Sequence, residues 1–304
     1  MKHAAFVLLL LTTVACTRKA EPVVESAPTP EATSFAGKPL FTTPAKPEAL
    51  AKSDSAINAI KAKGELGEDD YVEIGKQLVA TARYKMAVEN YTEGLAKYPN
   101  SYKLLRNRGH RYITLRQLDP CIADLTKAEE LIRNEPDVME FGLDGKPTAS
   151  VRHQIWYHIA VYNYLVGDFR KAAAAFEQAV ATGGDLKNVV GASDWLYNCY
   201  QRQGDKTKAE AVIKPISPDA DTDRESAYFR RLLLYKGVIK PEELINVNMA
   251  PDSMGVNEVT KMYGLANWYR YGGDTTTANM LCKNILQSNA WPGFAYAGAE
   301  KDIK

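Results

Sequence analysis

The chain has 304 residues, of which 45% are hydrophobic and 25% are charged, as is usual for a folded globular protein. Its formal net charge is only +1, which argues against a nucleic-acid-binding protein, because such a protein carries a basic stripe or a high isoelectric point. We therefore expect no nucleic-acid partner, and no polybasic attraction to anionic lipid.

The first fifteen residues have the pattern of an export signal. Lys2 and His3 supply positive charge, and residues 4–14 form an apolar run shorter than the roughly 20 residues that span a bilayer. The ending Thr13-Val14-Ala15-Cys16 resembles the lipobox of bacterial lipoproteins, with Thr13 where Leu is usual. The resemblance implies that residues 1–15 are removed and that Cys16 carries a lipid. The alternative is a plain secretory signal followed by an incidental cysteine.

The residues after Cys16 bear on location and on the start of the fold. No Asp follows Cys16 directly, and by the same resemblance this implies a cell-envelope protein in the outer membrane, facing the periplasm. Residues 16–45 are rich in Pro, Ala, Thr, Glu and Ser, which predicts a disordered tether. The folded domain should cover residues 46–304, and Pro47 should open a helix that runs to about residue 63.

A spaced triplet then returns five times and sets the architecture. It consists of a small residue, a bulky residue four positions later, and a small or apolar residue three positions after that. The triplets are Ala87/Tyr91/Gly94, Cys121/Leu125/Ala128, Ala172/Phe176/Ala179, Ala209/Ile213/Ile216 and Ala278/Cys282/Ile285. Twelve residues before each triplet lies a further residue that is usually small, such as Gly75 or Gly109. Such a period predicts stacked helix pairs, in which the small residues allow close helix crossings.

The triplets divide the chain into repeats. The predicted pairs cover about 68–100, 102–134, 153–182 and 190–216, followed by a degenerate pair at 223–250, a last pair at 259–288 and a polar end cap at 291–304. The second and third triplets lie 51 residues apart instead of 34. The excess falls at 135–150, where Gly and Pro predict a loop, and insertions of this kind often form the working face of a solenoid.

These features resemble the tetratricopeptide repeat (TPR). The resemblance is carried by Tyr71-x-x-x-Gly75, by Trp156-x-x-x-Ala160, by Gly167-Asp168-Phe169 and by the five triplets. It implies an all-α protein, a right-handed α-solenoid of TPR helix-turn-helix repeats, with the first helix of each pair lining a concave groove. Together, the lipobox and the repeats are similar to those of bacterial lipoproteins that act as scaffolds.

The repeat register predicts which residues face the groove. They combine cations, amides and tyrosines, which suit a peptide backbone or a carboxylate. The predicted groove residues are Lys76, Arg106, His110, Tyr157, Tyr164, Asn198, Arg202, Asn267, Arg270 and Tyr271. The stretch Arg106, Arg108, His110 and Arg111 is the most basic patch, and a solvated helix face or an acidic partner would explain it equally well.

We expect a membrane-anchored scaffold that binds a protein or peptide partner, through the groove or through the 135–150 insertion. One alternative is a homodimer formed through the apolar segment with Trp291, Phe294 and Tyr296, and another is a receptor for a small ligand or glycan. The sequence holds no catalytic, phosphate-binding or dinucleotide motif, so we expect neither an enzyme nor a cofactor. Cys121, Cys199 and Cys282 lack metal-ligand spacing and should be buried thiols, so no metal is expected.

Overall fold

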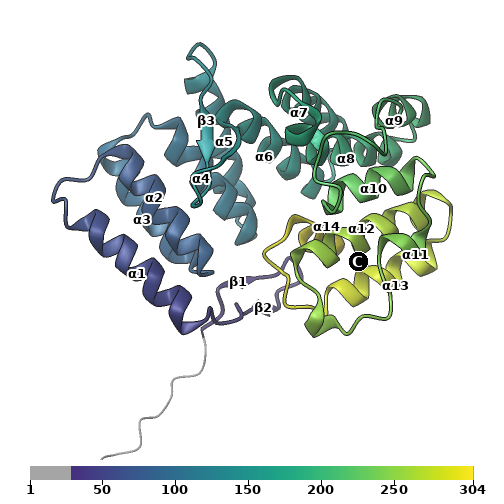
Figure 1. Cartoon of the computed structure of the whole chain (residues 1–304), viewed down its shortest axis with the longest axis horizontal. Coiled ribbons are helices and arrows are strands. Elements are labelled where there is room, and N and C mark those ends of the chain that lie inside the picture. Colours follow the sequence, from purple (N-terminus) through teal and green to yellow (C-terminus); the bar gives the residue numbers. More distant parts are fainter. Residues whose placement is uncertain (1–28, 304) are drawn as a thin grey trace, which may run out of the picture.

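The computed structural model describes residues 29–303. Over this range the chain forms fourteen α-helices, one short 3-10 helix and two small two-stranded sheets. Helices that follow one another in the sequence pack side by side (Figure 1), so the predicted all-α solenoid of helical repeats is confirmed. No helix within residues 29–303 is both long and apolar enough to cross a bilayer.

The first half of the solenoid begins with α1 (Pro47–Lys61) and continues as four helix pairs. These are α2 (Glu68–Ala80) with α3 (Tyr84–Lys97), α4 (Tyr102–Thr114) with α5 (Leu118–Ile132), α6 (Val151–Leu165) with α7 (Phe169–Thr182), and α8 (Leu186–Gln203) with α9 (Lys206–Ile213). The second half contains α10 (Ala227–Tyr235), α11 (Pro241–Leu244), the 3-10 helix (Pro251–Ser253), α12 (Val256–Tyr271), α13 (Thr275–Ile285) and α14 (Phe294–Asp302).

The Gly-Asp turns begin the second helices of three pairs. Gly167 has φ of +84°, a left-handed conformation that glycine adopts without steric cost. The next residue, Asp168, caps α7, because its side chain accepts a hydrogen bond from the backbone N–H of Lys171. The same arrangement recurs at Gly204-Asp205 and at Gly273-Asp274.

The small residues of the repeat allow close helix crossings. A Cβ added to Gly75 on α2 would lie 2.2 Å from the ring of Tyr91 on α3, and one added to Gly109 on α4 would lie 2.9 Å from Leu125 on α5. Both distances are shorter than van der Waals contact. In these two pairs the bulky residue of the triplet therefore fills the space that the absent glycine side chain leaves.

The C-terminal helix folds back into the concave side of the solenoid. α14 packs against α12, α13 and α6, and lies inside the arc of the other helices (Figure 1). Ala295, Tyr296 and Ala297 are at most 6% exposed. The expectation of a polar end cap at 291–304 is therefore wrong, because residues 295–299 are apolar and buried on all sides of the helix, and the curvature of the solenoid provides the surface that covers them.

The expected tether at 16–45 needs a correction in its C-terminal part. β1 (Ala32–Thr33) and β2 (Pro39–Leu40) pair antiparallel, and both Ala32 and Leu40 are buried. The indole N–H of Trp291 donates to the carbonyl of Phe41 at 2.6 Å, so the hairpin connects the two ends of the arc (Figure 1). Burial of a few apolar side chains thus stabilises this hairpin, although the segment is rich in Pro and Ser. Residues 1–28, with the signal and Cys16, lie outside the described residues.

The insertion at 135–150 is a second hairpin instead of a loop. β3 (Met139–Phe141) pairs antiparallel with β4 (Pro147–Ser150), with an irregular register between Met139 and Phe141. The Lys76 ammonium on α2 donates to the carbonyl of Phe141 at 2.8 Å. The hairpin therefore lies over the first helices of the early repeats, on the side where the groove was predicted.

Candidate functional site

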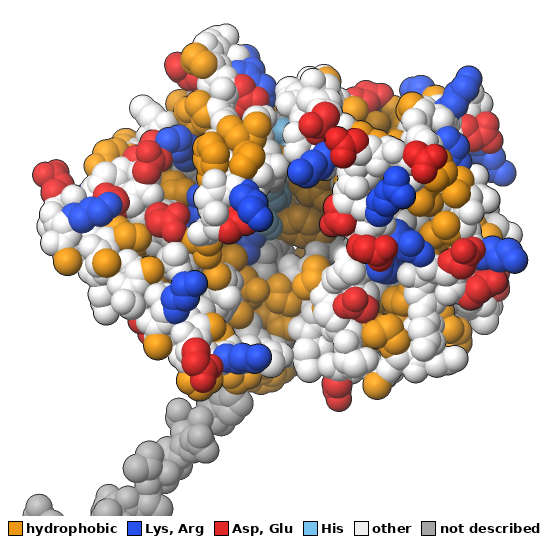
Figure 2. Space-filling model, in the orientation of Figure 1, with side chains coloured by type: hydrophobic (Ala, Val, Ile, Leu, Met, Phe, Trp, Pro, Cys, Tyr) orange, Lys and Arg blue, Asp and Glu red, His pale blue; other side chains and the backbone are white. Residues whose placement is uncertain are grey.

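The structure divides the predicted groove residues into two groups. Lys76, Arg106, His110 and Tyr157 lie on the early helices α2, α4 and α6. The molecular surface is hollowed near these helices (Figure 2). The other six residues bond to one another and to the C-terminal helix. The two groups therefore have different roles, and each is described separately.

We call the first feature the basic hollow. It lies between α4, α6, the β3–β4 hairpin and α14, and histidine and hydrophobic side chains are visible within it (Figure 2). The side chains that define it are Arg106, His110, Arg111, Glu140, His158 and Phe294. Phe294 joins the helices across the hollow, with its ring centroid 5.2 Å from that of His110 and 5.7 Å from that of His158.

Arg106 pairs with a carboxylate that the insertion supplies. Its guanidinium forms an ion pair with Glu140 on β3, and Arg106 is only 5% exposed. The Nε atom of Arg106 is buried and has no hydrogen-bond partner within residues 29–303. A buried guanidinium with an unused donor is costly unless another acceptor reaches it.

Arg111 is a buried cation without an ionic partner. It is 8% exposed, and no ion pair or hydrogen bond joins its side chain to another residue in the range 29–303. Its guanidinium carbon lies 5.7 Å from the centre of the Tyr84 ring, a cation–π contact. Burial lowers the pKa of Arg111 to about 10, and the positive charge of Arg106 acts in the same direction.

Two histidines meet beside these arginines. The ring centroids of His110 on α4 and His158 on α6 are 4.1 Å apart. Burial lowers the pKa of both rings well below the usual value, and the positive charges of Arg106 and Arg111 lower them further. Both histidines are therefore neutral near pH 7.

The neutral tautomer of His158 follows from its hydrogen bond. The Nδ1 atom lies 2.6 Å from the carbonyl oxygen of Gln154, and a carbonyl only accepts, so Nδ1 carries the proton. The Nε2 atom of the neutral ring then has a free lone pair. His158 can consequently take up a second proton at Nε2.

Tyr157 belongs to the wall behind the histidines. Its hydroxyl donates to the hydroxyl of Tyr228 at 3.4 Å, and its ring packs edge-on against Phe176. Tyr157 is thus held by α7 and α10 and supports the site from behind.

The second group surrounds the carboxylate of Asp302 at the end of α14. Arg202 on α8 lies 2.6 Å from this carboxylate and Arg270 on α12 lies 3.1 Å from it. The hydroxyl of Tyr263 donates to the same oxygen at 3.1 Å and contacts the hydroxyl of Tyr164 at 3.1 Å. The concave side of the later repeats is therefore occupied by the chain itself.

The remaining residues of this group also bond within the chain, although Nε of Arg202 and Nδ2 of Asn267 are buried without a hydrogen-bond partner among residues 29–303. Asn267 accepts from both Arg202 and Arg270, at 2.9 and 2.8 Å. Tyr271 donates to the side chain of Asn198 at 2.8 Å. The assignment of Tyr164, Asn198, Arg202, Asn267, Arg270 and Tyr271 to one open groove is therefore wrong. Arg202 and Arg270 bind Asp302 of α14, whereas Asn198 is buried and bonds to Tyr235 and Tyr271. Tyr271 also lines a separate surface pocket with Tyr197 and Trp268.

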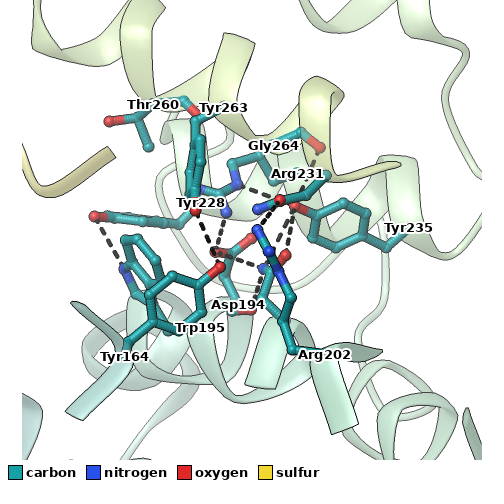
Figure 3. A network of polar contacts seen from close by, with 12 residues as sticks. Tyr164, Asp194, Trp195, Arg202, Tyr228, Arg231, Tyr235, Thr260, Tyr263 and Gly264 are labelled. Atoms are coloured by element: carbon teal, nitrogen blue, oxygen red, sulfur yellow. Dashed lines mark hydrogen bonds and ion pairs between the residues drawn. The ribbon is translucent and has the colours of Figure 1, made fainter. Parts of the chain in front are cut away.

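A buried ion pair lies next to this group (Figure 3). Asp194 and Arg231 are 2.8 Å apart and both side chains are 0% exposed. Burial raises the pKa of Asp194 to about 7, and the charge of Arg231 opposes that rise. The Arg231 chain crosses Gly264, where an added Cβ would lie 2.4 Å from it. Asp194 lies on α8, Arg231 on α10 and Gly264 on α12, so these contacts hold the three helices together.

The basic hollow contains residues that the repeat register alone does not select. Arg111 was visible in the sequence as part of the basic patch, whereas Arg108 in the same patch forms an ion pair with Asp124 on α5 instead. His158 and Glu140 were not selected, and Phe294 was noted only as part of an apolar segment. Glu140 and Phe294 reach the hollow only because the hairpin and α14 fold over it. No group of three or more His, Cys, Asp or Glu residues in the described part of the chain could hold a metal ion.

Comparisons with known proteins show similarity of fold at most. No family model and no curated protein matches the chain. One similar solved structure is that of Naa15/Naa10 bound to HypK-THB, with 15% identity and a TM-score of 0.34 over 79% of this chain and 36% of that one. Another is the TPR domain of P58(IPK), with 14% identity and a TM-score of 0.22 over 84% and 74%. The chain thus spans about a third of the length of the first neighbour, and neither likeness carries a functional argument.

Proposed function

We propose that the protein is a scaffold that binds a protein or peptide partner at the basic hollow and the adjoining β3–β4 hairpin. We also propose that a lipid on Cys16 anchors it in the bacterial cell envelope, at the outer membrane and facing the periplasm. The role is one of binding and requires no catalysis. Helical repeats suit it, because stacked pairs present an extended surface on a rigid frame.

One observation carries the proposal, namely that the insertion and the open part of the groove form one surface. Lys76 and Arg106, two predicted groove residues, contact Phe141 and Glu140 of the hairpin. The hairpin also exposes apolar side chains, with Phe141 51% and Leu143 47% exposed. Exposed apolar residues beside buried cations are typical of an interaction site.

The partner surface can be tested with a photo-crosslinking amino acid at Phe141. We expect this position to crosslink a discrete partner in intact cells. Met280 is a matched control, because it is 55% exposed and belongs to α13, which lies far from the β3–β4 hairpin (Figure 1). Equal crosslinking at both positions, or none at Phe141, would contradict the proposed surface.

The anchor rests on the sequence of the N-terminus and has its own test. Metabolic labelling with a fatty acid should acylate the wild-type chain, and Cys16→Ser should abolish the label and release the protein from the membrane fraction. An unlabelled but exported wild-type chain would instead indicate a plain secretory signal. This outcome would leave the partner surface unaffected.

The two alternatives now differ in their support. The apolar C-terminal segment predicts a homodimer interface. However, Trp291 and Tyr296 are only 2% and 6% exposed and pack within the chain, so these side chains are not available to a second copy. A small-ligand receptor is favoured by one specific observation, the buried and unpaired Arg111 in the hollow. This second candidate leads to a more definite inference.

A further inference from the structure

We infer that the basic hollow is an oxyanion-binding site, in which a carboxylate or phosphate group binds Arg111 and Arg106 and displaces Glu140. The oxyanion can belong to a free small molecule or to a side chain of a bound partner. The inference does not depend on the proposed protein partner, because it concerns the chemistry of the hollow itself.

Arg111 provides the first argument. An ionised guanidinium taken out of water is destabilising unless a counter-ion or several acceptors compensate. Arg111 is 8% exposed, and within residues 29–303 it makes only a cation–π contact, with Tyr84. Its five N–H donors suit the oxygens of a carboxylate or a phosphate.

The ion pair between Arg106 and Glu140 provides the second argument. It shows that the hollow accommodates a carboxylate oxygen against a buried guanidinium. Glu140 belongs to a short hairpin whose neighbouring residues Met139 and Phe141 are 45% and 51% exposed, so this carboxylate can leave without opening the helical core. We therefore regard Glu140 as an internal competitor for the site.

The histidine pair provides a third feature, which makes binding depend on pH. An anion beside Arg111 would add negative charge close to His158 and would raise the pKa of that ring, whose Nε2 can accept a proton. Binding is then accompanied by proton uptake and strengthens as the pH falls. The titratable and charged groups around the pair are Arg106, His110 and Arg111 on α4, His153, Tyr157 and His158 on α6, Glu73 on α2, Tyr84 and Tyr91 on α3, and Glu140 on β3. Phe294 on α14 adds no charge.

The test is calorimetric titration of the purified full-length chain with inorganic phosphate and, separately, with acetate. Sodium chloride keeps the ionic strength constant and serves as the non-specific anion. We expect saturable binding of at least one of the two, accompanied by uptake of about one proton when buffers of different ionisation enthalpy are compared. The phosphate and acetate arms show which oxyanion the hollow prefers.

Three variants locate the binding. Arg111→Gln should weaken it by at least about tenfold, equivalent to the loss of one charge-assisted contact. Glu140→Gln removes the internal competitor and should strengthen binding, a gain that misfolding cannot mimic. Arg108→Gln is the control, because Arg108 lies on the same helix but pairs with Asp124, and it should leave affinity unchanged.

Two results would overturn the inference. One is the absence of saturable binding of either anion, at tens of millimolar, to both the wild type and Glu140→Gln. The other is binding that Arg108→Gln weakens as much as Arg111→Gln does, which would indicate general charge attraction. Circular dichroism of each variant confirms that a loss of binding does not reflect a loss of helix.

Discussion

The guanidinium of Arg202 lies 2.6 Å from the carboxylate of Asp302, across 100 residues of sequence. This contact joins the first helix of the fourth pair to the last helix of the chain. It explains why the later part of the predicted groove is closed, and it places Arg270 beside the same carboxylate at 3.1 Å. Asp302 is therefore the shared counter-ion of two arginines.

Asp302→Asn should lower the free energy of unfolding by about 2–4 kcal/mol, because it leaves two largely buried guanidiniums without a counter-charge. Urea denaturation followed by circular dichroism measures the change. Arg133→Gln is the control, since Arg133 is 60% exposed in its pair with Glu129, and such a pair contributes about 1 kcal/mol or less. Similar losses in both variants would show that Asp302 holds α14 no better than a surface pair would.

The buried pair of Asp194 and Arg231 should behave differently from a hydrophobic contact. Asp194→Asn leaves a fully buried cation and should cost about 3–5 kcal/mol. The double variant Asp194→Leu with Arg231→Met removes both charges and should recover much of that loss, because well-packed apolar residues can replace a buried pair. A double variant as unstable as Asp194→Asn would contradict this account.

The crossing of Gly75 and Tyr91 gives a steric prediction. Gly75→Ala puts a Cβ 2.2 Å from the Tyr91 ring and should destabilise the protein by about 1–3 kcal/mol through overpacking. Gly191 on α8 is the matched control, since the nearest atom to its added Cβ lies at 3.4 Å. Gly191→Ala should be neutral or stabilise by about 0.5–1 kcal/mol, because alanine favours the helix. Thermal denaturation of the two variants shows whether each one is less stable or more stable than the wild type.

Acidification below about pH 6.5 should destabilise the fold. Burial lowers the pKa of His110 and His158 below the value near 6.5 of an unfolded chain. Below that pH the unfolded chain binds protons that the folded chain does not, so the free energy of unfolding falls with pH by up to about 1.4 kcal/mol per unit for each histidine. Denaturation at about pH 7.5 and about pH 5.5 measures the slope.

A variant of His158 tests whether the histidines cause this pH dependence of the free energy of unfolding. His158→Asn keeps a side-chain donor for the carbonyl of Gln154 but cannot titrate. The slope between these pH values should therefore decrease by up to about 1.4 kcal/mol per pH unit. His110 and His153, whose pKa values burial also lowers, account for the slope that remains. An unchanged slope would assign the effect to other groups.

The repeats could be predicted from the sequence because their signals are local. The five triplets and the Gly-Asp turns act within one helix pair, where Tyr91 fills the space beside Gly75 and Asp168 caps α7. Side chains three and four residues apart lie on one helix face whatever the rest of the chain does. Such spacing therefore identified both the fold class and the close crossings.

The candidate site depended on contacts between residues far apart in the sequence. Arg116 and Glu300, separated by 184 residues, form a buried ion pair that helps to hold the C-terminal helix inside the arc. Small rotations between successive pairs add up to the curvature that brings α14 to α6. The 135–150 hairpin lies between α5 and α6 in the sequence and folds over the neighbouring α4 to reach Arg106. The sequence alone thus determined the helical repeats, whereas only the tertiary structure decided which part of the concave surface stays open, because that depends on the sum of all the helix crossings.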